Sequence, residues 1–497
     1  MRDNLETTKE EAPSSPKNGA PNATTSHMLV ASQKNQEIAS IICSTDACKE
    51  TLLRAELSDL GNAQRLAALA GGNIRYRSGT KTFLTWSGTH WVEDKRAGML
   101  LAMHGMKALR EIAIASSKEG LSSFALRSQA HSRIKDACKL FALQPGIKID
   151  TESLDSDDFL FNVQNGTIDL RSGELHPHCA GDFITKISKV TYDPEAKCPT
   201  FDRFIDQITM GRQDLASYLQ RVAGYILTGS IKEQCLFFLY GGGSNGKSKF
   251  LDVLSELCGD YCRRTPASTL MNGMRSAGQA SPDLVRLERT RMVRASELSN
   301  GSAFDESLIK DMTGGETMVA RGLYNNDYEE FLPKFKLIFA GNHKPNIKGT
   351  DDGIWRRVNL IPFDFRATDE AKDPDLGVKL SAELSGVLNW AIEGCLNWQQ
   401  EGLNAPQVVM EAVTGYRNES NPFEGWFEEC CEVEDGAEER AKDLYGSYKE
   451  WAQAYHEKPK TNTLFGKFLT SKFEKVNKRG MVYLGVRLLT PEGAETP

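Results

Sequence analysis

Several features are scarce or missing in this sequence, and each absence narrows the class of protein. No run approaches the roughly 18 apolar residues that a membrane-spanning helix needs, and the N-terminus lacks the hydrophobic segment of a secretory signal. The eleven cysteines include no C-x-x-C pair, the usual spacing in a structural zinc site. We therefore expect a soluble, cytoplasmic protein with free thiols, no structural zinc and no membrane partner.

An excess of basic residues is also missing. The 60 Lys and Arg residues are outnumbered by 67 Asp and Glu residues, which gives a formal net charge of −7. Nucleic-acid-binding faces are commonly basic. A protein that encloses its ligand needs positive groups only along the enclosed channel, however, and its outer surface can be acidic. The composition therefore does not exclude a nucleic-acid partner.

Length and composition predict several domains, because 497 residues exceed what one hydrophobic core usually supports. Residues 1–50 are rich in Ser, Thr, Asn, Lys and Glu and poor in aromatic residues, so we expect a disordered tail there. The rest divides into five expected parts: an α+β domain at 51–200, a helical collar at 201–230, an α/β core at 231–365, a helical segment at 366–420 and a C-terminal domain at 421–497. A long amphipathic helix is predicted over residues 376–395 of the helical segment.

A glycine-rich segment with the spacing G-x-x-x-x-G-K-S follows the apolar run at residues 235–240. Such a loop lets backbone N–H groups close on a β-phosphate, while Lys247 neutralises the β- and γ-phosphates and Ser248 can ligate Mg²⁺. The candidate nucleotide-binding residues are Gly241, Gly242, Gly243, Ser244, Asn245, Gly246, Lys247 and Ser248. The motif predicts nucleotide binding but leaves kinases, GTPases, transporter motors and helicases open.

Polar residues that follow two later strand-like runs are candidates for catalysis. Glu297 follows the run at 291–295, and such an acid can coordinate Mg²⁺ or polarise an attacking water. Asn342 follows the run at 335–340, where its amide could sense a γ-phosphate. Arg356 and Arg357 supply guanidinium groups suited to transition-state charge on a phosphate. Taken singly, each of these is more typical of a strand end, a turn or a surface ion pair.

The order of these motifs resembles one family. The shared segments, all within the 117 residues from 241 to 357, are the phosphate-binding loop, the strand ending in Glu297, residues 310–316 with Arg321, residues 340–345 and residues 355–357. Together they resemble the superfamily 3 helicases of the phage/plasmid primase-helicase and poxvirus nucleoside triphosphatase type. Upstream, residues 59–63, 165–170 and 192–194 resemble the domain that precedes the motor in that family.

The resemblance implies an AAA+-like α/β core that binds ATP and Mg²⁺ between the subunits of a ring, usually a hexamer. Arg356 or Arg357 would then reach the ATP of a neighbouring subunit. A DNA-contacting β-hairpin is implied between Arg321 and Lys334, with its tip at residues 322–327. The candidate DNA contacts of this region are Arg321, Tyr324, Asn325, Lys334 and Lys336.

The C-terminal domain is a second candidate for binding nucleic acid. Apolar residues at helical spacing over 441–451 and 465–469, followed by a strand-like run at 481–486, fit a winged-helix domain, which the family resemblance also implies. Residues 460–489 carry seven basic residues and one acidic residue, a local charge of +6. The candidate contacts are Lys472, Lys475, Lys478 and Arg479, although a basic helix face is often only solvated.

These inferences lead to one expected function and two alternatives. We expect an ATP-dependent, ring-forming DNA helicase of a phage, plasmid or integrated element, moving 3′ to 5′, without primase activity of its own and partnered with a separate primase. An origin-binding initiator that melts DNA without processive unwinding is the first alternative. An RNA-directed motor is the second. All three need the same ATPase core.

Overall fold

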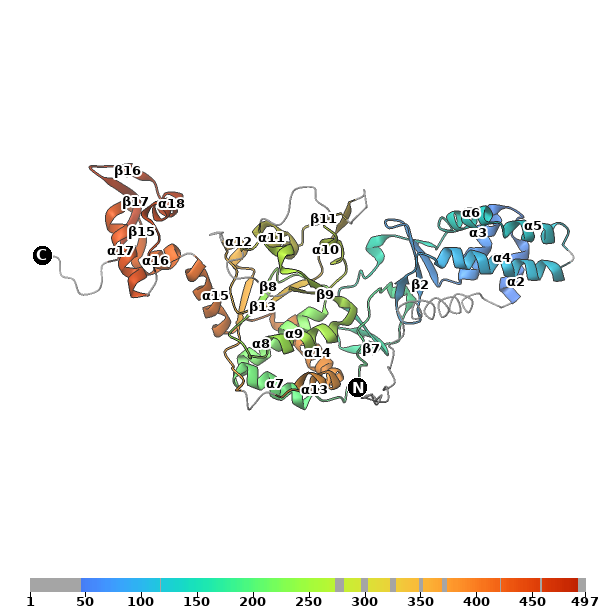
Figure 1. The fold of residues 1–497 in the computed structure, drawn as a ribbon, viewed down its shortest axis with the longest axis horizontal. Coiled ribbons are helices and arrows are strands. Elements are labelled where there is room, and N and C mark those ends of the chain that lie inside the picture. The colour runs from blue at the N-terminus through green and yellow to red at the C-terminus, as the bar shows by residue number, and fades with distance from the viewer. Residues whose placement is uncertain are drawn as a thin grey trace, which may run out of the picture. The chain divides into compact units, whose positions relative to one another are not determined.

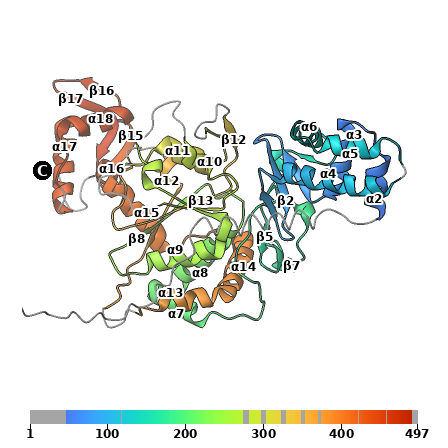
Figure 2. The same cartoon turned by 45° about the vertical axis from the view of Figure 1, so that its right-hand side comes forward.

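The computed structural model describes residues 46–116, 118–272, 281–295, 303–321, 328–347, 352–368, 373–420, 422–455 and 458–489. The chain forms two compact units, which meet in the sequence between Leu154 and Asp155 (Figures 1 and 2). None of the helices in the described ranges combines the length and the apolar character that crossing a membrane requires.

The first unit is an α+β domain. Its elements are α2 (Asp46–Arg54), α3 (Asp59–Ala70), β1 (Ile74–Arg77), β2 (Thr82–Trp86), β3 (Trp91–Glu93), α4 (Ala97–Ala115), α5 (Leu121–Ser128), α6 (His131–Phe141) and β4 (Lys148–Ile149). The four strands form one sheet in the order β3-β2-β1-β4. Leu66, Leu101 and Phe141, from three different helices, are fully buried in its core. Arg65 is also buried and donates hydrogen bonds to the carbonyl of Leu52 in the last turn of α2 and to those of Ala55 and Glu56 just after the helix.

The second unit is built on a five-stranded parallel sheet. The strands are β8 (Leu236–Tyr240), β9 (Cys262–Thr265), β10 (Met292–Ala295), β13 (Lys336–Gly341) and β14 (Val358–Pro362), in the order β14-β8-β13-β10-β9. The β8 side chains from Leu236 to Leu239 are at most 1% exposed, as expected for a parallel strand covered on both faces. The chain leaves β8 toward β9 at one edge of the sheet, and β14, the last of the five strands in the chain, lies on the other side of β8. A ligand crevice is expected at the carboxyl ends of strands at such a point.

The elements around the sheet fall into two groups. Before β8 come β5 (Leu160–Val163), β6 (Gly166–Asp169), β7 (Glu174–His176), α7 (Pro199–Thr209) and α8 (Gln213–Leu227). After β8 come α9 (Lys247–Cys258), α10 (Pro282–Val285), α11 (Glu306–Gly314), β11 (Met318–Ala320), β12 (Glu329–Phe331), α12 (Asp352–Trp355), α13 (Leu376–Ala382), α14 (Leu384–Glu401) and α15 (Gln407–Ser420). Phe161 and Ile168 share one apolar cluster with α7, α8 and β8. Residues 155–200 therefore pack with the core of the parallel sheet, and the division between the two units falls at residue 154, not at the expected residue 200.

Helices α8 and α14 cross with their backbones in contact. A Cβ atom at Gly224 would lie 2.0 Å from the backbone nitrogen of Cys395, and one at Gly394 would lie 2.0 Å from the carbonyl oxygen of Gln220. Both distances are far too short for any side chain. The crossing therefore requires a glycine on each helix.

The single helix expected over residues 376–395 is in fact two helices, α13 and α14, which are separated at Glu383. The Glu383 carboxylate accepts hydrogen bonds from the backbone N–H groups of Thr200 and Phe201, each at 2.9 Å. These N–H groups lie in the first turn of α7, where no helical acceptor exists. This tertiary contact satisfies them and fixes the break.

The C-terminal module, residues 422–489, has its own core. Its elements are α16 (Pro422–Cys430), β15 (Cys431–Arg440), α17 (Ala441–Ala454), α18 (Asn462–Lys472), β16 (Lys475–Asn477) and β17 (Met481–Leu488). The strands pair in the order β15-β17-β16, and the core is aromatic, with Trp426, Tyr448, Phe465 and Tyr483 at most 1% exposed. The two helices and the strand expected from the sequence are present.

Candidate nucleotide-binding site

The glycine-rich segment forms the loop between β8 and α9. Gly246 has φ of +86°, and a Cβ atom there would lie 2.6 Å from a methyl carbon of Ile208 on α7. A Cβ atom at Gly241 would lie 2.3 Å from the carbonyl oxygen of Phe363. Glycine is therefore required at both ends of the loop by close packing, and at Gly246 also by its backbone conformation.

The loop borders a cavity of about 360 Å³ at the carboxyl end of the sheet. Its lining comprises Gly242, Gly243, Ser244, Asn245, Lys247 and Ser248 from the loop and α9, together with Arg264, Arg294, Ala295, Ala340, Gly341 and Asn342 from three strands and the residue after β13. Three cationic side chains and the exposed hydroxyl of Ser248 face one space, and no carboxylate is among these residues. This chemistry fits a polyphosphate that binds with a divalent cation.

Lys247 is held at the centre of the loop and is only 5% exposed. Its ammonium group donates to the carbonyl oxygens of Gly241 and Gly242, at 2.7 and 3.0 Å, and to the Asn245 side chain at 2.9 Å. It also donates to Oδ1 of Asn342 at 3.1 Å. The ammonium group is therefore already positioned where the loop can present it to phosphate oxygens.

Asn342 reaches Lys247 because β13 and β8 are adjacent parallel strands. Gly341, the last residue of β13, is paired with Tyr240, the last residue of β8. Both strands thus end at the same level, and the residues that follow them meet in the cavity. The structure brings these two predicted site residues together.

Glu297 lies outside the described residues. The strand that precedes it, β10, ends at Ala295, which lines the cavity and is paired with Phe339 of β13. The chain therefore enters the segment that contains Glu297 from the edge of the cavity. The role assigned to Glu297 stays a prediction.

Two arginines of the cavity were not identified from the sequence. Arg294 on β10 and Arg264 on β9 are paired positions of adjacent strands. Nη1 of Arg294 lies 2.5 Å from Oδ1 of Asp252 on α9, and Nη2 of Arg264 lies 3.5 Å from the same oxygen. An arginine near the end of an otherwise apolar strand, as in Met292–Ala295, was the sequence signal that could have revealed Arg294.

The side chains of Arg356 and Arg357 lie in different environments. The Arg357 side chain is buried, with Nε donating to the Thr313 hydroxyl at 3.0 Å and Nη1 donating to the Gly353 carbonyl at 2.5 Å. Arg356 is exposed at the end of α12. Arg357 is therefore engaged by residues of the same chain, whereas Arg356 is exposed to solvent.

The region between Arg321 and Lys334, which was expected to hold a β-hairpin, contains β12. This strand pairs antiparallel with β11, which lies just before Arg321, with Met318 opposite Phe331. Tyr324 and Asn325 of the expected tip lie outside the described residues. The Arg321 guanidinium carbon lies 5.8 Å from the centre of the Tyr328 ring. Lys334 forms an ion pair with Asp158 at 2.6 Å, so this lysine is already engaged within the protein.

Lys336 does not fit its predicted role as a DNA contact, because its side chain is only 1% exposed. It lies at the amino end of β13, where Nζ donates to the carbonyls of Thr228 and Ser230 just beyond α8. Arg291 donates to the neighbouring Leu227 carbonyl. Burial, reinforced by repulsion from Arg291, lowers the pKa of Lys336 to about 7. The two cations satisfy carbonyl groups at the C-terminus of α8, where positive charge is favourable.

The four residues predicted to contact nucleic acid in the C-terminal module also differ in their surroundings. Lys472 forms an ion pair at 2.8 Å with Glu424, which is largely buried, and its ammonium group lies over the rings of Phe427 and Phe468. This contact anchors α18 to α16. Lys475, Lys478 and Arg479 instead line a surface groove of the module.

Comparisons with known proteins agree with the motifs found in the sequence. Residues 63–210 match the family described as D5 N terminal like. The chain is 26% identical over 322 residues to a protein of Acanthamoeba polyphaga mimivirus named "Putative helicase", covering 60% of this chain and 33% of that protein. It is 27% identical over 255 residues to a "Putative helicase" of Frog virus 3, covering 48% of this chain and 26% of that protein.

A third relative is a protein of African swine fever virus named "Putative primase", which is 23% identical over 214 residues and covered over 22% of its length. The matches thus span a third or less of each of these three relatives. These likenesses support a relationship to D5-like primase-helicase proteins of viruses.

Among solved structures, the apo structure of the NrS-1 C-terminal region (305–718) covers 83% of this chain and 96% of that chain, with 12% identity and a TM-score of 0.43. A TM-score of this size does not establish a common fold.

Proposed function

We propose that the protein is an ATP-dependent DNA helicase of the superfamily 3 type. It assembles as a ring, with a hexamer as the expected size, and moves 3′ to 5′ along single-stranded DNA that passes through the ring. A separate primase is the proposed partner. The names of the viral relatives support the helicase class, while the ring, the polarity and the primase rest on the family resemblance.

The observation that carries the proposal is the contact between Lys247 and Asn342 at the carboxyl end of the parallel sheet. A phosphate-binding loop alone would fit any nucleotide-binding protein. A polar side chain from the adjacent strand, placed on the loop lysine, supplies a group that can respond to the γ-phosphate and so distinguish ATP from ADP. An energy-converting ATPase needs such a group.

The residues around this contact have complementary proposed roles. The loop binds the phosphates of ATP, Lys247 neutralises them, and Ser248 and Glu297 hold Mg²⁺, which when bound offsets the phosphate charge. Glu297 also orients the attacking water. Arg356, being exposed, is the residue that completes the site of the neighbouring subunit, and Arg357 keeps its structural role. The all-parallel sheet with the loop after β8 supports an AAA+-like core.

The β11–β12 pair is the proposed pore hairpin. Arg321 lies directly after β11, and the tip that includes Tyr324 and Asn325 would contact the strand inside the ring. The order of elements in the C-terminal module, helix-strand-helix-helix-strand-strand, supports the winged-helix assignment.

One observation favours the second candidate function, an origin-binding initiator that melts DNA without processive unwinding. The C-terminal module has a basic groove suited to duplex DNA, which a pure translocase does not need. Both candidates use the same ATPase site. They differ in whether ATP hydrolysis displaces a long strand.

The experiment is strand displacement on forked DNA with either a 3′ or a 5′ tail. We expect unwinding of the 3′-tailed fork by the wild type, loss in Lys247→Ala and Asn342→Ala, and retention in Lys249→Ala, which removes an exposed lysine from the same helix. DNA-stimulated ATP hydrolysis without displacement would select the initiator. Absence of any ATP hydrolysis would refute both candidates.

A further inference from the structure

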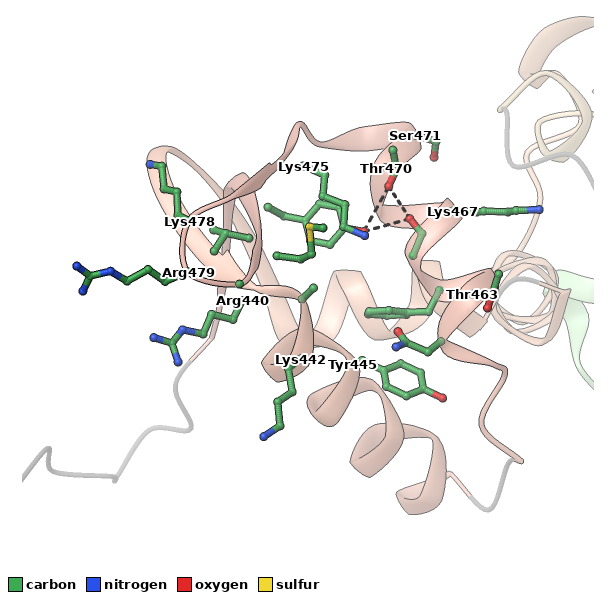
Figure 3. Close-up of a pocket in the computed structure, with 18 residues that line it drawn as sticks. Arg440, Lys442, Tyr445, Thr463, Lys467, Thr470, Ser471, Lys475, Lys478 and Arg479 are labelled. Carbon is green, nitrogen blue, oxygen red and sulfur yellow. Dashed lines mark hydrogen bonds between the residues drawn. The ribbon is translucent and has the colours of Figure 1, made fainter.

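The C-terminal module has a groove between α18 and the β16–β17 hairpin, bordered on one side by the start of α17 (Figure 3). It encloses about 1020 Å³. Four of the α18 side chains that line it are small and polar: Asn462, Thr463, Thr470 and Ser471. The groove thus offers hydrogen-bonding groups along a helix and positive charge at its edges.

Charge is strongly segregated within this module. Figure 3 draws the 18 residues that line the groove, and none of them is acidic. Six of them are basic: Arg440, Lys442, Lys467, Lys475, Lys478 and Arg479. Carboxylates are concentrated on β15 instead, which carries Glu432, Glu434, Asp435, Glu438 and Glu439. A protein with a net charge of −7 therefore keeps a groove whose lining residues include six cations and no carboxylate.

Most of the cations that line the groove are not held in ion pairs. Lys472 and Arg487, which do not line it, are paired with Glu424 and Glu432. Within the groove, Lys478 is paired with Glu438. In the described part of the chain the other five cations have no carboxylate partner, so their charge is available to an external anion.

The arrangement of these cations suits a double helix. In Figure 3, Arg440, Lys442, Lys478 and Arg479 project from one side of the groove, and Lys467 points away on the opposite side. Charges on two sides match the two phosphate backbones of a duplex. Single-strand sites usually add aromatic side chains on which bases stack. Of the three aromatic residues that line this groove, Phe465 and Tyr483 are each only 1% exposed because they belong to the module's core. The third, Tyr445, is half-buried, and its hydroxyl donates to the Lys460 carbonyl at 3.0 Å.

We propose that this groove binds the phosphate backbones of duplex DNA, with Lys467, Lys475 and Arg479 as principal contacts. The choice of DNA rests on the proposed function, which the inference deepens by giving the protein a duplex site separate from the ATPase site. Lys467, Lys442 and Arg440 are added to the residues expected from the sequence, and Lys472 is removed because it is engaged with Glu424.

The test is equilibrium binding of a blunt 20-base-pair fluorescent duplex to the full chain carrying Lys247→Ala, without ATP, over a range of salt concentrations. The groove variant adds Lys467→Ala, Lys475→Ala and Arg479→Ala. The matched control instead adds Lys139→Ala, Lys379→Ala and Arg487→Ala, which removes the same charge from exposed residues that are already ion-paired.

We expect the groove variant to weaken duplex binding about tenfold or more and to reduce the slope of log affinity against log salt by roughly 2 to 3, because each phosphate contact contributes about 0.9. The control should bind nearly as the parent does. Equal binding by the groove variant and the control would overturn the proposal, as would a loss confined to a single-stranded 20-mer. Because ATP hydrolysis is not involved, failure of the helicase proposal leaves this result intact.

Discussion

Nζ of Lys247 lies 3.1 Å from Oδ1 of Asn342, although 95 positions separate the two residues in the chain. The contact exists because β8 and β13 are adjacent parallel strands whose last residues are paired with each other. It links the lysine that we propose binds the phosphates of ATP to the asparagine that we propose senses the γ-phosphate. The first prediction concerns this contact.

Replacing Asn342 with Ala should leave ATP affinity within a few-fold of the wild type and lower the ATP turnover number about a hundredfold, the usual cost of removing one transition-state hydrogen bond. Asn342→Asp should instead weaken ATP binding, because a carboxylate would hold the Lys247 ammonium and repel phosphate. Calorimetric binding of a non-hydrolysable ATP analogue and steady-state hydrolysis separate these effects. A normal turnover number in Asn342→Ala would exclude the sensor role.

Arg356→Ala should lower ATP turnover about a thousandfold or more, as expected for loss of an arginine that acts in trans. Its unfolding midpoint should not change, because the side chain is exposed. Mixing Arg356→Ala with Lys247→Ala should restore part of the activity, since mixed rings contain sites with both groups intact. If mixing restores nothing, Arg356 does not act between subunits.

Arg357→Ala should destabilise the fold by about 1–3 kcal/mol, because it leaves the Thr313 hydroxyl and the Gly353 carbonyl without their partner in a buried site. Chemical unfolding measures this difference. Arg356→Ala is the matched control and should show little or no change.

Arg294→Ala should weaken ATP binding about tenfold, because a charged hydrogen bond contributes about 1.5 kcal/mol or more. The effect on AMP binding should be smaller, because β13 lies between the strand that carries Arg294 and β8, whose following loop is proposed to bind the first phosphates. Asp252→Asn should strengthen ATP binding slightly, since it frees Arg294 from its ion pair. Equal losses for ATP and AMP would argue against a γ-phosphate contact.

The lowered pKa of Lys336 should make the stability of the protein depend on pH. Its pKa is about 7 in the folded protein, against 10.5 for the unperturbed group, so the unfolded chain binds more protons between these values. Stability should therefore rise with pH above 7, by at most about 1.4 kcal/mol per pH unit. Urea unfolding at pH 7.0 to about 8.5 should show this rise in the wild type and in Lys249→Met, and a smaller rise in Lys336→Met. The same slope in all three proteins would contradict a buried, weakly basic lysine.

Motifs with strong local constraints were predictable from the sequence. The loop after β8 has a fixed spacing of Gly, Lys and Ser, and the strand before Asn342 is a continuous apolar run, so their meeting at one edge of a sheet followed from the parallel arrangement. The helices α17 and α18 also lie where the sequence placed them. Of the hairpin that the family resemblance implied after Arg321, β12 lies within the expected residues, but its partner β11 precedes them.

The features that were missed depend on contacts between distant segments. The break at Glu383 is set by the N-terminus of α7, and nothing in the periodicity of residues 376–395 reveals it. Lys336 looks like a surface cation beside a hairpin, but its partners are carbonyls more than one hundred positions earlier. The pairing of Arg294 with Asp252 likewise requires knowing which face of β10 meets α9.

The crossing of α8 and α14 limits how this chain can vary. Neither Gly224 nor Gly394 has room for a single additional carbon, because the backbone of the other helix occupies that position. A relative that carries alanine at either site must hold its helices farther apart, which would open a gap beneath the sheet that larger neighbouring side chains would have to fill. The residue types at these two positions therefore indicate how closely the two helices approach each other in any related chain.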